Sequence, residues 1–192
     1  SDNLPRSVYT GLIEAVRSRL PAYRRYLELR RRVLKVDKLH IYDSYVPIVD
    51  APEREYTYEQ ACGIVRENLA PLGEDYLSGL DRLLEGGWVD VFETPGKATG
   101  AYATGVYGVH PYMLLNFVGN LNDVFTLAHE AGHCMHTCYS DRQPYMNKDY
   151  PILLAEIAST VNENILMRGM IGKCDMSAPD GKLEKAFLLN RF

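Results

Sequence analysis

The sequence predicts a mainly α-helical chain with one small β-sheet. Three observations support this fold class. Charged segments with a helical spacing of apolar residues fill the first part of the chain, a stretch rich in glycine, aromatic and β-branched residues lies between residues 88 and 117, and helical spacing returns after it. The 192 residues, 46% of them hydrophobic, suffice for the core of one domain, or of one domain with an appendage.

The first segment with helical spacing extends from Pro5 to about Val36, where apolar residues recur among many arginines. It predicts one long helix, either continuous or interrupted at Pro21. The run Arg30-Arg31-Arg32 near its end could bind phosphate, but positive charge near a helix C-terminus also suits the helix dipole. We favour the second explanation and assign these arginines no functional role.

Two further helices are predicted before residue 88. Helical spacing extends from Thr57 to Leu72 and from Glu74 to Leu84, and Gly86-Gly87 closes the second of these segments. The stretch from Leu39 to Val49, which precedes both, looks extended and is broken by Pro47.

The residues from Trp88 to Phe117 differ in character from those before them, because glycine, aromatic and β-branched residues replace the charged helical pattern. Two strands are expected here, Gly100–Tyr107 and Tyr112–Phe117. The connection Gly108–Pro111 contains the glycine and proline that are typical of a turn, so the two strands are predicted to form a hairpin.

Helical spacing returns after the hairpin. Asn122 or Asp123 can cap a helix that covers Val124–Cys138. After a polar loop, Pro151 is well placed in the first turn of a helix that extends to about Met170. The last residues, Lys185–Phe192, stop within an amphipathic pattern and the first residue is not Met, so the chain is expected to be part of a longer protein.

The composition is that of an ordinary soluble protein and argues against several classes of partner. Lys and Arg number 21 against 25 Asp and Glu, and no long run of one sign indicates a nucleic-acid or membrane-surface partner. No apolar run approaches the ~18 residues of a membrane span, and the N-terminus lacks the pattern of a signal peptide. A cytoplasmic location is therefore expected, and the sparse cysteines are expected to be reduced thiols.

The helix predicted at Val124–Cys138 contains the motif His-Glu-x-x-His. The separation of four places His129 and His133 one turn apart on the same face, where two imidazoles can bind one zinc ion. Glu130 points beside such a metal, where its carboxylate can act as the base that activates water for peptide-bond hydrolysis. The motif therefore predicts a zinc-peptidase active site with one zinc ion per chain.

A catalytic zinc ion needs a third protein ligand. The helix that follows Pro151 carries Glu156 and Glu163, seven residues apart and so close to one face. Because the preceding loop lets this helix run back past the first, its early turns are expected near His129 and His133, and Glu156 is the predicted third ligand. Glu163 is expected to hydrogen-bond a ligand histidine. For either residue, the alternative is a solvated glutamate on the helix surface.

Three other residues of the motif helix are weaker candidates. His136 lies three positions after His133 and is expected either to hydrogen-bond beside the metal ligands or simply to pack. Cys134 and Cys138 lie off the face that carries the two histidine ligands, so a role as small apolar core residues is favoured over thiolate ligation.

Taken together, these motifs resemble a known family, and the resemblance is densest from about residue 88 to 165. The chain is similar to oligoendopeptidase F, of the thimet-oligopeptidase-like zinc metallopeptidases. The resemblance implies a zincin-like, mainly helical fold with a deep channel, cleavage of short peptides, and the role of third zinc ligand for Glu156. The segments that carry it include Trp88-Val-Asp-Val, Gly100-Ala-Tyr, His110-Pro-Tyr-Met-Leu-Leu-Asn-Phe, Asp123 to His136 and Ala155 to Glu163.

The same resemblance implies that a substrate peptide lies along the edge of the small sheet, beside the strand Gly100–Tyr107. Tyr102 and His110 are weak substrate-binding candidates on this basis, with packing as the alternative. Members of the family are considerably longer, so groups that stabilise the oxyanion are expected beyond Phe192. Two interpretations follow: a zinc-dependent endopeptidase acting on oligopeptides, and a truncated fragment that binds zinc or peptide without turnover.

The predicted organisation has two parts. Residues 1–86 form a helical region, and residues 87–192 form the zinc-binding catalytic core with the hairpin, the motif helix and the helix that carries Glu156. The expected partner is an oligopeptide substrate, whereas neither nucleic acid nor a membrane is expected. The sequence gives no indication of the oligomeric state.

Overall fold

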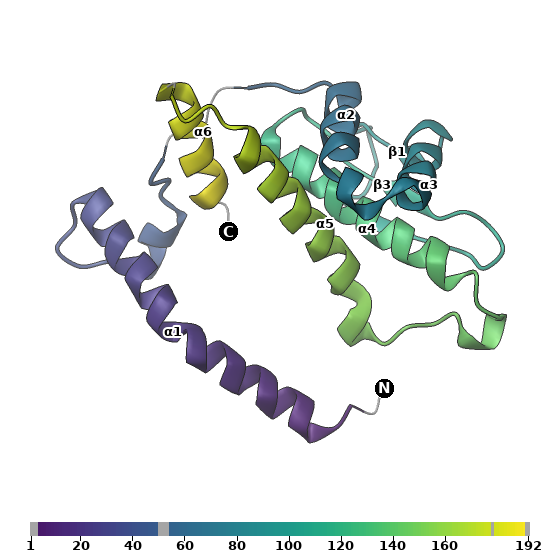
Figure 1. Ribbon diagram of the computed structural model, residues 1–192, viewed down its shortest axis with the longest axis horizontal. Coiled ribbons are helices and arrows are strands. Elements are labelled where there is room, and N and C mark those ends of the chain that lie inside the picture. Colours follow the sequence, from purple (N-terminus) through teal and green to yellow (C-terminus); the bar gives the residue numbers. More distant parts are fainter. Residues whose placement is uncertain (1–3, 50–53, 178, 191–192) are drawn as a thin grey trace. The chain divides into compact units, whose positions relative to one another are not determined.

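The structure is a computed structural model that describes residues 4–49, 54–177 and 179–190 (Figure 1). The chain divides into two compact units, one formed by residues 1–52 and 176–192 and the other by residues 53–175. The division predicted between residues 86 and 87 falls inside the second unit and stays a prediction. Within the described ranges, no helix is both long enough and apolar enough to span a bilayer.

The first unit begins with α1 (Arg6–Leu34), a continuous helix that keeps Pro21 in its interior. This confirms the long helix predicted from the spacing of apolar residues. The helix ends where Lys35 adopts a left-handed backbone conformation with φ of 56°. Arg31 and Arg32 place positive charge in the last turn, as the helix dipole favours.

Arg30 has a structural role that the sequence did not suggest. Its side chain is buried, and its guanidinium donates to the backbone carbonyls of Asp43, Ser44 and Val46 at 2.7, 3.0 and 2.5 Å. An arginine can satisfy several carbonyls at once because its donors are fixed in a planar fork. Arg30 therefore ties the following segment to α1.

That segment forms η1 (Ile41–Tyr45), a short 3-10 helix. The extended conformation predicted for Leu39–Val49 is wrong at these residues. The carboxylate of Asp43 accepts a hydrogen bond from the His40 amide at 2.6 Å. At the other end of the turn, Arg30 donates to the backbone carbonyls of Asp43 and Ser44. With both ends satisfied by side chains, a tight turn is stable where the local pattern favoured an extended chain.

The second unit opens with α2 (Tyr58–Asn68) and α3 (Glu74–Glu85), joined through the 3-10 turn η2 (Ala70–Leu72). The first of these helices is shorter than predicted because Pro71 has no backbone donor and disfavours a helical conformation at the residue before it. Gly86 ends α3, as expected.

A three-stranded sheet follows, with the strand order β1-β3-β2. Strand β2 (Tyr102–Thr104) pairs antiparallel with β3 (Tyr112–Leu114), which confirms the predicted hairpin. Strand β1 (Val89–Asp90), which pairs parallel with β3, adds to the two predicted strands.

Both strands of the hairpin are shorter than predicted, and before β2 the reason is a set of side-chain hydrogen bonds. The Asn116 amide donates to the backbone carbonyls of Ala98 and Gly100, both at 2.9 Å. The buried Lys97 side chain donates to two further carbonyls of this region, at 3.1 and 2.7 Å. The segment before Tyr102 is therefore a loop tied to the sheet rather than the start of a strand.

Helix α4 (Leu121–Ser140) carries the histidine motif and begins earlier than predicted. Its N-cap is Asn120, so the cap predicted at Asn122 or Asp123 is wrong. The Asn120 side chain accepts from the Asp123 amide at 3.0 Å, and the Asp123 carboxylate accepts from the Asn120 amide at 3.1 Å. This reciprocal capping box fixes where the helix starts.

Helix α5 (Ile152–Lys173) starts directly after Pro151, follows the short turn η3 (Tyr145–Asn147), and runs antiparallel to α4 (Figure 1). Helix α6 (Pro179–Asn190) belongs to the first unit, and the last two residues of the predicted amphipathic pattern lie outside the described residues. Buried side chains from α2, α3, the β3 segment, α4 and α5 form the core of the second unit, among them Val65, Leu80, Leu83, Met113, Leu115, Phe125, Leu127 and Leu166.

Candidate metal centre

Helices α4 and α5 cross where their backbones lie close together. Gly132 provides the space, because a Cβ atom at this position would lie 2.6 Å from the Ser159 Cα and 2.8 Å from the Ala158 carbonyl oxygen. Glycine, which has no Cβ atom, permits such a close approach. The crossing brings the early and middle turns of α5 against the histidine motif.

The three predicted metal ligands meet beside this crossing. The Nε2 atoms of His129 and His133 lie 3.2 Å apart, and Oε2 of Glu156 lies 3.3 Å from each of them. On the other side of its ring, His129 donates from Nδ1 to Oε1 of Glu163 at 2.6 Å. The structure therefore brings together these four side chains from two helices.

The distances within this cluster suit a tetrahedral metal ion. Zinc binds histidine nitrogen and carboxylate oxygen at ~2.0–2.2 Å, and the corners of a regular tetrahedron of this size lie about 3.3–3.6 Å apart. The observed separations of 3.2 and 3.3 Å lie close to the lower end of this range. Two nitrogens and one oxygen, with a fourth corner for water or substrate, form the donor set of a catalytic zinc site.

Hydrogen bonds around the two imidazoles leave the nitrogens that a metal needs. His129 uses Nδ1 to bond Oε1 of Glu163. Nε2 of His129 then keeps its lone pair, and the Nε2 atoms of both rings face Oε2 of Glu156. Burial lowers the pKa of His133, which favours the neutral ring that metal ligation requires.

Glu130 lies beside the cluster without joining it. It is only 6% exposed, and no described residue hydrogen-bonds its buried Oε2. Burial raises the pKa of Glu130, while the nearby His129 opposes this shift and Glu156 adds to it. A buried carboxylate with a raised pKa and a free oxygen can accept a proton near neutral pH.

Glu156 is the most exposed member of the cluster. Its side chain is 65% exposed, against 27% for His129 and 18% for His133. A hydrogen bond of 2.8 Å from Ser159 Oγ to Oε2 is the main cause that lowers the pKa of Glu156. The carboxylate is therefore ionised at neutral pH, as a metal ligand must be. Nothing in the sequence pattern singles out Ser159.

His136 is not part of the cluster of predicted metal ligands. Its ring stacks on Tyr150 with 3.8 Å between the centroids, and no described residue hydrogen-bonds its buried Nδ1. Of the two roles predicted for His136, these contacts support packing. Cys134 is buried and Cys138 is half-buried, and both are free thiols away from the ligand cluster.

Strand β2 runs alongside α4. Near its start, Ala101 and Thr126 line a common cavity, and beyond its end a Cβ atom on Gly105 would lie 2.7 Å from Cγ2 of Thr137. The part of α4 between Thr126 and Thr137 contains the whole histidine motif, so the strand flanks the motif. Tyr102, on this strand, is half exposed.

His110 is held by packing. Its ring stacks on Trp88 with 4.1 Å between the centroids, and its Nδ1 hydrogen-bonds the Pro111 carbonyl at 2.9 Å. No contact among the described residues links it to the histidine pair. Substrate contact by His110 therefore has weaker support than contact by Tyr102.

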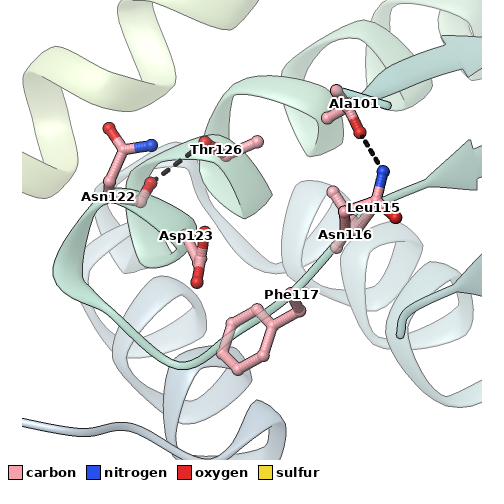
Figure 2. A pocket seen from close by; sticks show the side chains of 8 residues that line it. Ala101, Leu115, Asn116, Phe117, Asn122, Asp123 and Thr126 are labelled. Carbon is pink, nitrogen blue, oxygen red and sulfur yellow. Dashed lines mark hydrogen bonds between the residues drawn. The ribbon is translucent and has the colours of Figure 1, made fainter. Parts of the chain in front are cut away.

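A cavity of about 280 Å³ lies on the N-terminal side of the motif (Figure 2). Thr126, one turn before Glu130 on α4, forms part of its wall, and Asn116 and Phe117 contribute from the segment after β3. The spacing of four between Thr126 and Glu130 is the sequence signal that could have placed Thr126 near the site. The lining residues are Gly100, Ala101, Leu115, Asn116, Phe117, Asn122, Asp123 and Thr126.

Comparison with known proteins places this chain among peptidases. The family model "Peptidase family M3" matches residues 1–173. Over 191 residues the chain is 41% identical to oligopeptidase PepF of Bacillus subtilis (strain 168), covering 99% of this chain and 28% of that protein. Over 172 residues it is 41% identical to the chromosomal oligoendopeptidase F of Lactococcus lactis subsp. cremoris, covering 89% and 28%. The chain thus spans about 28% of the length of these relatives.

Solved structures share the fold. A chain from Chlamydophila abortus matches with a TM-score of 0.87 and 41% identity, covering 99% of this chain and 31% of that chain. Oligoendopeptidase-F from Enterococcus faecium matches with a TM-score of 0.61 and 29% identity, covering 99% and 25%. The family model matches most of this chain, and the Bacillus subtilis relative matches nearly all of it. The chain therefore belongs to peptidase family M3.

Proposed function

We propose that the chain is the zinc-binding catalytic part of an endopeptidase that hydrolyses peptide bonds in short oligopeptides. The observation that carries this proposal is the meeting of His129 Nε2, His133 Nε2 and Glu156 Oε2 at 3.2 and 3.3 Å beside the buried Glu130. Membership of family M3, and relatives named oligopeptidase and oligoendopeptidase, support a peptidase.

His129, His133 and Glu156 would hold one zinc ion. When bound, zinc would polarise the carbonyl of the scissile bond and lower the pKa of a water molecule at the fourth position. Glu163 would keep the His129 ring turned so that Nε2 faces the other ligands, through the 2.6 Å hydrogen bond to Nδ1.

Glu130 would move the protons of the reaction. One of its oxygens accepts a proton from the attacking water, and the carboxyl group then passes this proton to the amine nitrogen of the departing product. Burial raises the pKa of Glu130, which brings it nearer to the value that suits a base working near neutral pH.

The substrate peptide would lie beside strand β2. Among the described residues this strand pairs on one side, with β3, so its other edge offers backbone groups to an extended peptide. Backbone pairing needs no particular side chains, which suits short peptides of varied sequence. Tyr102 is the side chain of β2 proposed to contact the peptide. The cavity lined by Thr126 would accept one side chain of the peptide. A cytoplasmic location stays a prediction of the sequence.

A second function has support from the length of the chain, which spans about 28% of its relatives. The family resemblance implies that the groups stabilising the oxyanion lie beyond Phe192. Loss of one such donor typically costs ~10²–10³ in turnover. The 192-residue chain would on this basis bind zinc and peptide without hydrolysing the peptide.

Zinc content and hydrolysis of a quenched fluorescent oligopeptide, measured on the chain and on Glu130→Gln, test the proposal. We expect about one zinc ion per chain in both proteins, and hydrolysis in the unsubstituted chain alone. Glu14→Gln, at an exposed position of α1, is the matched control. Hydrolysis that persists in Glu130→Gln would contradict the role of this residue as the base. Zinc binding without hydrolysis by the unsubstituted chain would favour the second function.

A further inference from the structure

Ser159 lies between the helix crossing and the carboxylate of Glu156. The residue is fully buried, with 0% of its surface exposed. Its Oγ lies 2.8 Å from Oε2 of Glu156 and 3.0 Å from the backbone carbonyl oxygen of the same residue. A hydroxyl has one proton to donate, and a charged carboxylate oxygen is a stronger acceptor than a carbonyl. The hydrogen bond to Oε2 is therefore the favoured one.

The oxygen that Ser159 contacts is also the oxygen that faces both histidines. Oε2 of Glu156 lies 3.3 Å from Nε2 of His129 and 3.3 Å from Nε2 of His133. A hydrogen bond to this atom fixes both which carboxylate oxygen points into the cluster and the direction in which it points.

Glu156 needs such a restraint more than the histidines do. Its side chain is 65% exposed, so surrounding side chains do not fix its rotamer. A glutamate in solvent samples many rotamers, and that freedom is lost when the carboxylate binds a metal. A hydrogen bond that holds the carboxylate in place beforehand reduces this loss and strengthens metal binding.

The two histidines cannot supply this restraint while they act as ligands. A ring nitrogen that binds a metal does so through its lone pair and carries no proton, so Nε2 of neither ring is a hydrogen-bond donor once the metal is bound. Lone pairs of this kind do not donate to Glu156. Among the described residues, the hydrogen-bond donor to Oε2 is then Ser159.

We infer that Ser159 is a positioning residue, whose hydroxyl holds the Glu156 carboxylate in the orientation that binds the metal. This inference rests on the proposed metal site and adds to it a residue that neither the histidine motif nor the need for a third ligand specifies. Ser159 acts through Glu156 and contacts neither substrate nor the reacting atoms.

Thr160 provides a matched control on the same turn of α5. Its Oγ1 donates to the same backbone carbonyl, that of Glu156, at 2.5 Å and lies 3.3 Å from the carbonyl of Ile157. No hydrogen bond joins it to the Glu156 carboxylate among the described residues. Thr160→Ala therefore removes a hydroxyl beside Ser159 and leaves the carboxylate untouched.

Zinc affinity of the 192-residue chain, measured by competition with a chelator of known affinity, tests the inference. Ser159→Ala is expected to weaken zinc binding ~10- to 100-fold, the range for groups that orient metal ligands. Thr160→Ala is expected to leave zinc affinity unchanged. Thermal unfolding of each variant establishes that it is folded, and alanine adds no volume at the helix crossing.

A double-mutant cycle with Glu156→Ala distinguishes positioning from a general effect on packing. If Ser159 acts through Glu156, Ser159→Ala causes no further loss of zinc affinity in the Glu156→Ala chain. Equal affinity of Ser159→Ala and the unsubstituted chain, or the same loss in both backgrounds, would overturn the inference and leave the metal site standing. An unsubstituted chain that binds no zinc would overturn the metal site and the inference with it.

Discussion

Helices α4 and α5 contribute to the same cluster but are held in different ways. Helix α4 has its buried residues between Val124 and Met135, and Leu127 and Ala131 on either side of the first histidine are 0% exposed. Helix α5 leaves large apolar side chains in contact with solvent, such as Ile157 at 53% exposure. Packing therefore fixes the predicted ligands on α4, whereas hydrogen bonds and one close backbone contact fix the predicted ligand on α5.

The two helices therefore differ in purpose: the packing of α4 keeps the second unit folded, whereas the hydrogen bonds of α5 align the predicted ligands. Substitutions in the buried part of α4 should lower the free energy of unfolding, and those on the exposed side of α5 should scarcely change it. Substitutions of the side chains that hydrogen-bond the cluster should reduce zinc affinity more than stability. Each expectation can be measured on the same chain.

The largest expected effect is on α4. Leu127→Ala removes a fully buried side chain and is expected to lower the free energy of unfolding by ~2–5 kcal/mol. Ile157→Ala, on the exposed side of α5, is expected to change it by no more than about 0.5 kcal/mol. Urea unfolding of both variants measures the difference. Similar losses in the two would mean that α5 is as tightly packed as α4.

The helix crossing should give the next largest effect. Gly132→Ala would place a Cβ atom 2.6 Å from the Ser159 Cα, and because backbone atoms cannot move aside the helices must separate. We expect a loss of about 1–3 kcal/mol in unfolding free energy, together with weaker zinc binding. Gly172→Ala is the control on α5, since nothing lies within 4 Å of its added Cβ atom. A Gly132→Ala chain with unchanged stability and zinc affinity would show that the crossing tolerates separation.

A smaller effect, confined to metal binding, is expected at Glu163. Glu163→Ala removes the partner of His129 Nδ1 at 2.6 Å and should weaken zinc binding ~10-fold or more, because the ring is free to turn. Asn164→Ala is the neighbouring control, since Asn164 is exposed and its amide donates to the Thr160 carbonyl rather than to a residue of the cluster. Equal zinc affinity in the two variants would remove Glu163 from the site.

The most subtle test uses the thiols. Burial raises the pKa of Cys134 on α4 to about 12, so almost no reactive thiolate is present at pH 8 in the folded chain. We expect iodoacetamide to modify Cys134 only when the chain unfolds, and to modify the half-buried Cys174 after α5 faster. Mass spectrometry over time gives both rates. Modification of Cys134 at the rate found in urea would show that α4 is not held by packing.

The ligand cluster followed from the sequence because its parts are governed by short-range geometry. His129 and His133 share a helix face through their spacing, and the loop after this helix lets the next helix return along it, which brings Glu156 into reach. Ser159 could not be found in the same way. A serine three residues after a glutamate is common on helices, and only the packing of α5 against Gly132 shows that its hydroxyl is buried beside the carboxylate.

The errors in the fold have a related cause. Asn120, Asn122 and Asp123 are all suitable caps, and the choice depends on which pair can bond reciprocally. The turn η1 depends on Arg30, which lies 13 residues before Asp43 and bonds its carbonyl. Patterns within a short window of sequence do not show a bond over that separation.

Strand β2 is three residues long, which limits what the edge left unpaired among the described residues can hold. At ~3.3 Å per residue it spans about 10 Å, enough to pair with the backbone of only a few residues. A long flat edge would attract other unpaired strands and promote aggregation, and a short one avoids this. If the edge binds a peptide as proposed, so few backbone bonds would let the peptide dissociate quickly, and the edge would favour rapid exchange of peptides over tight capture.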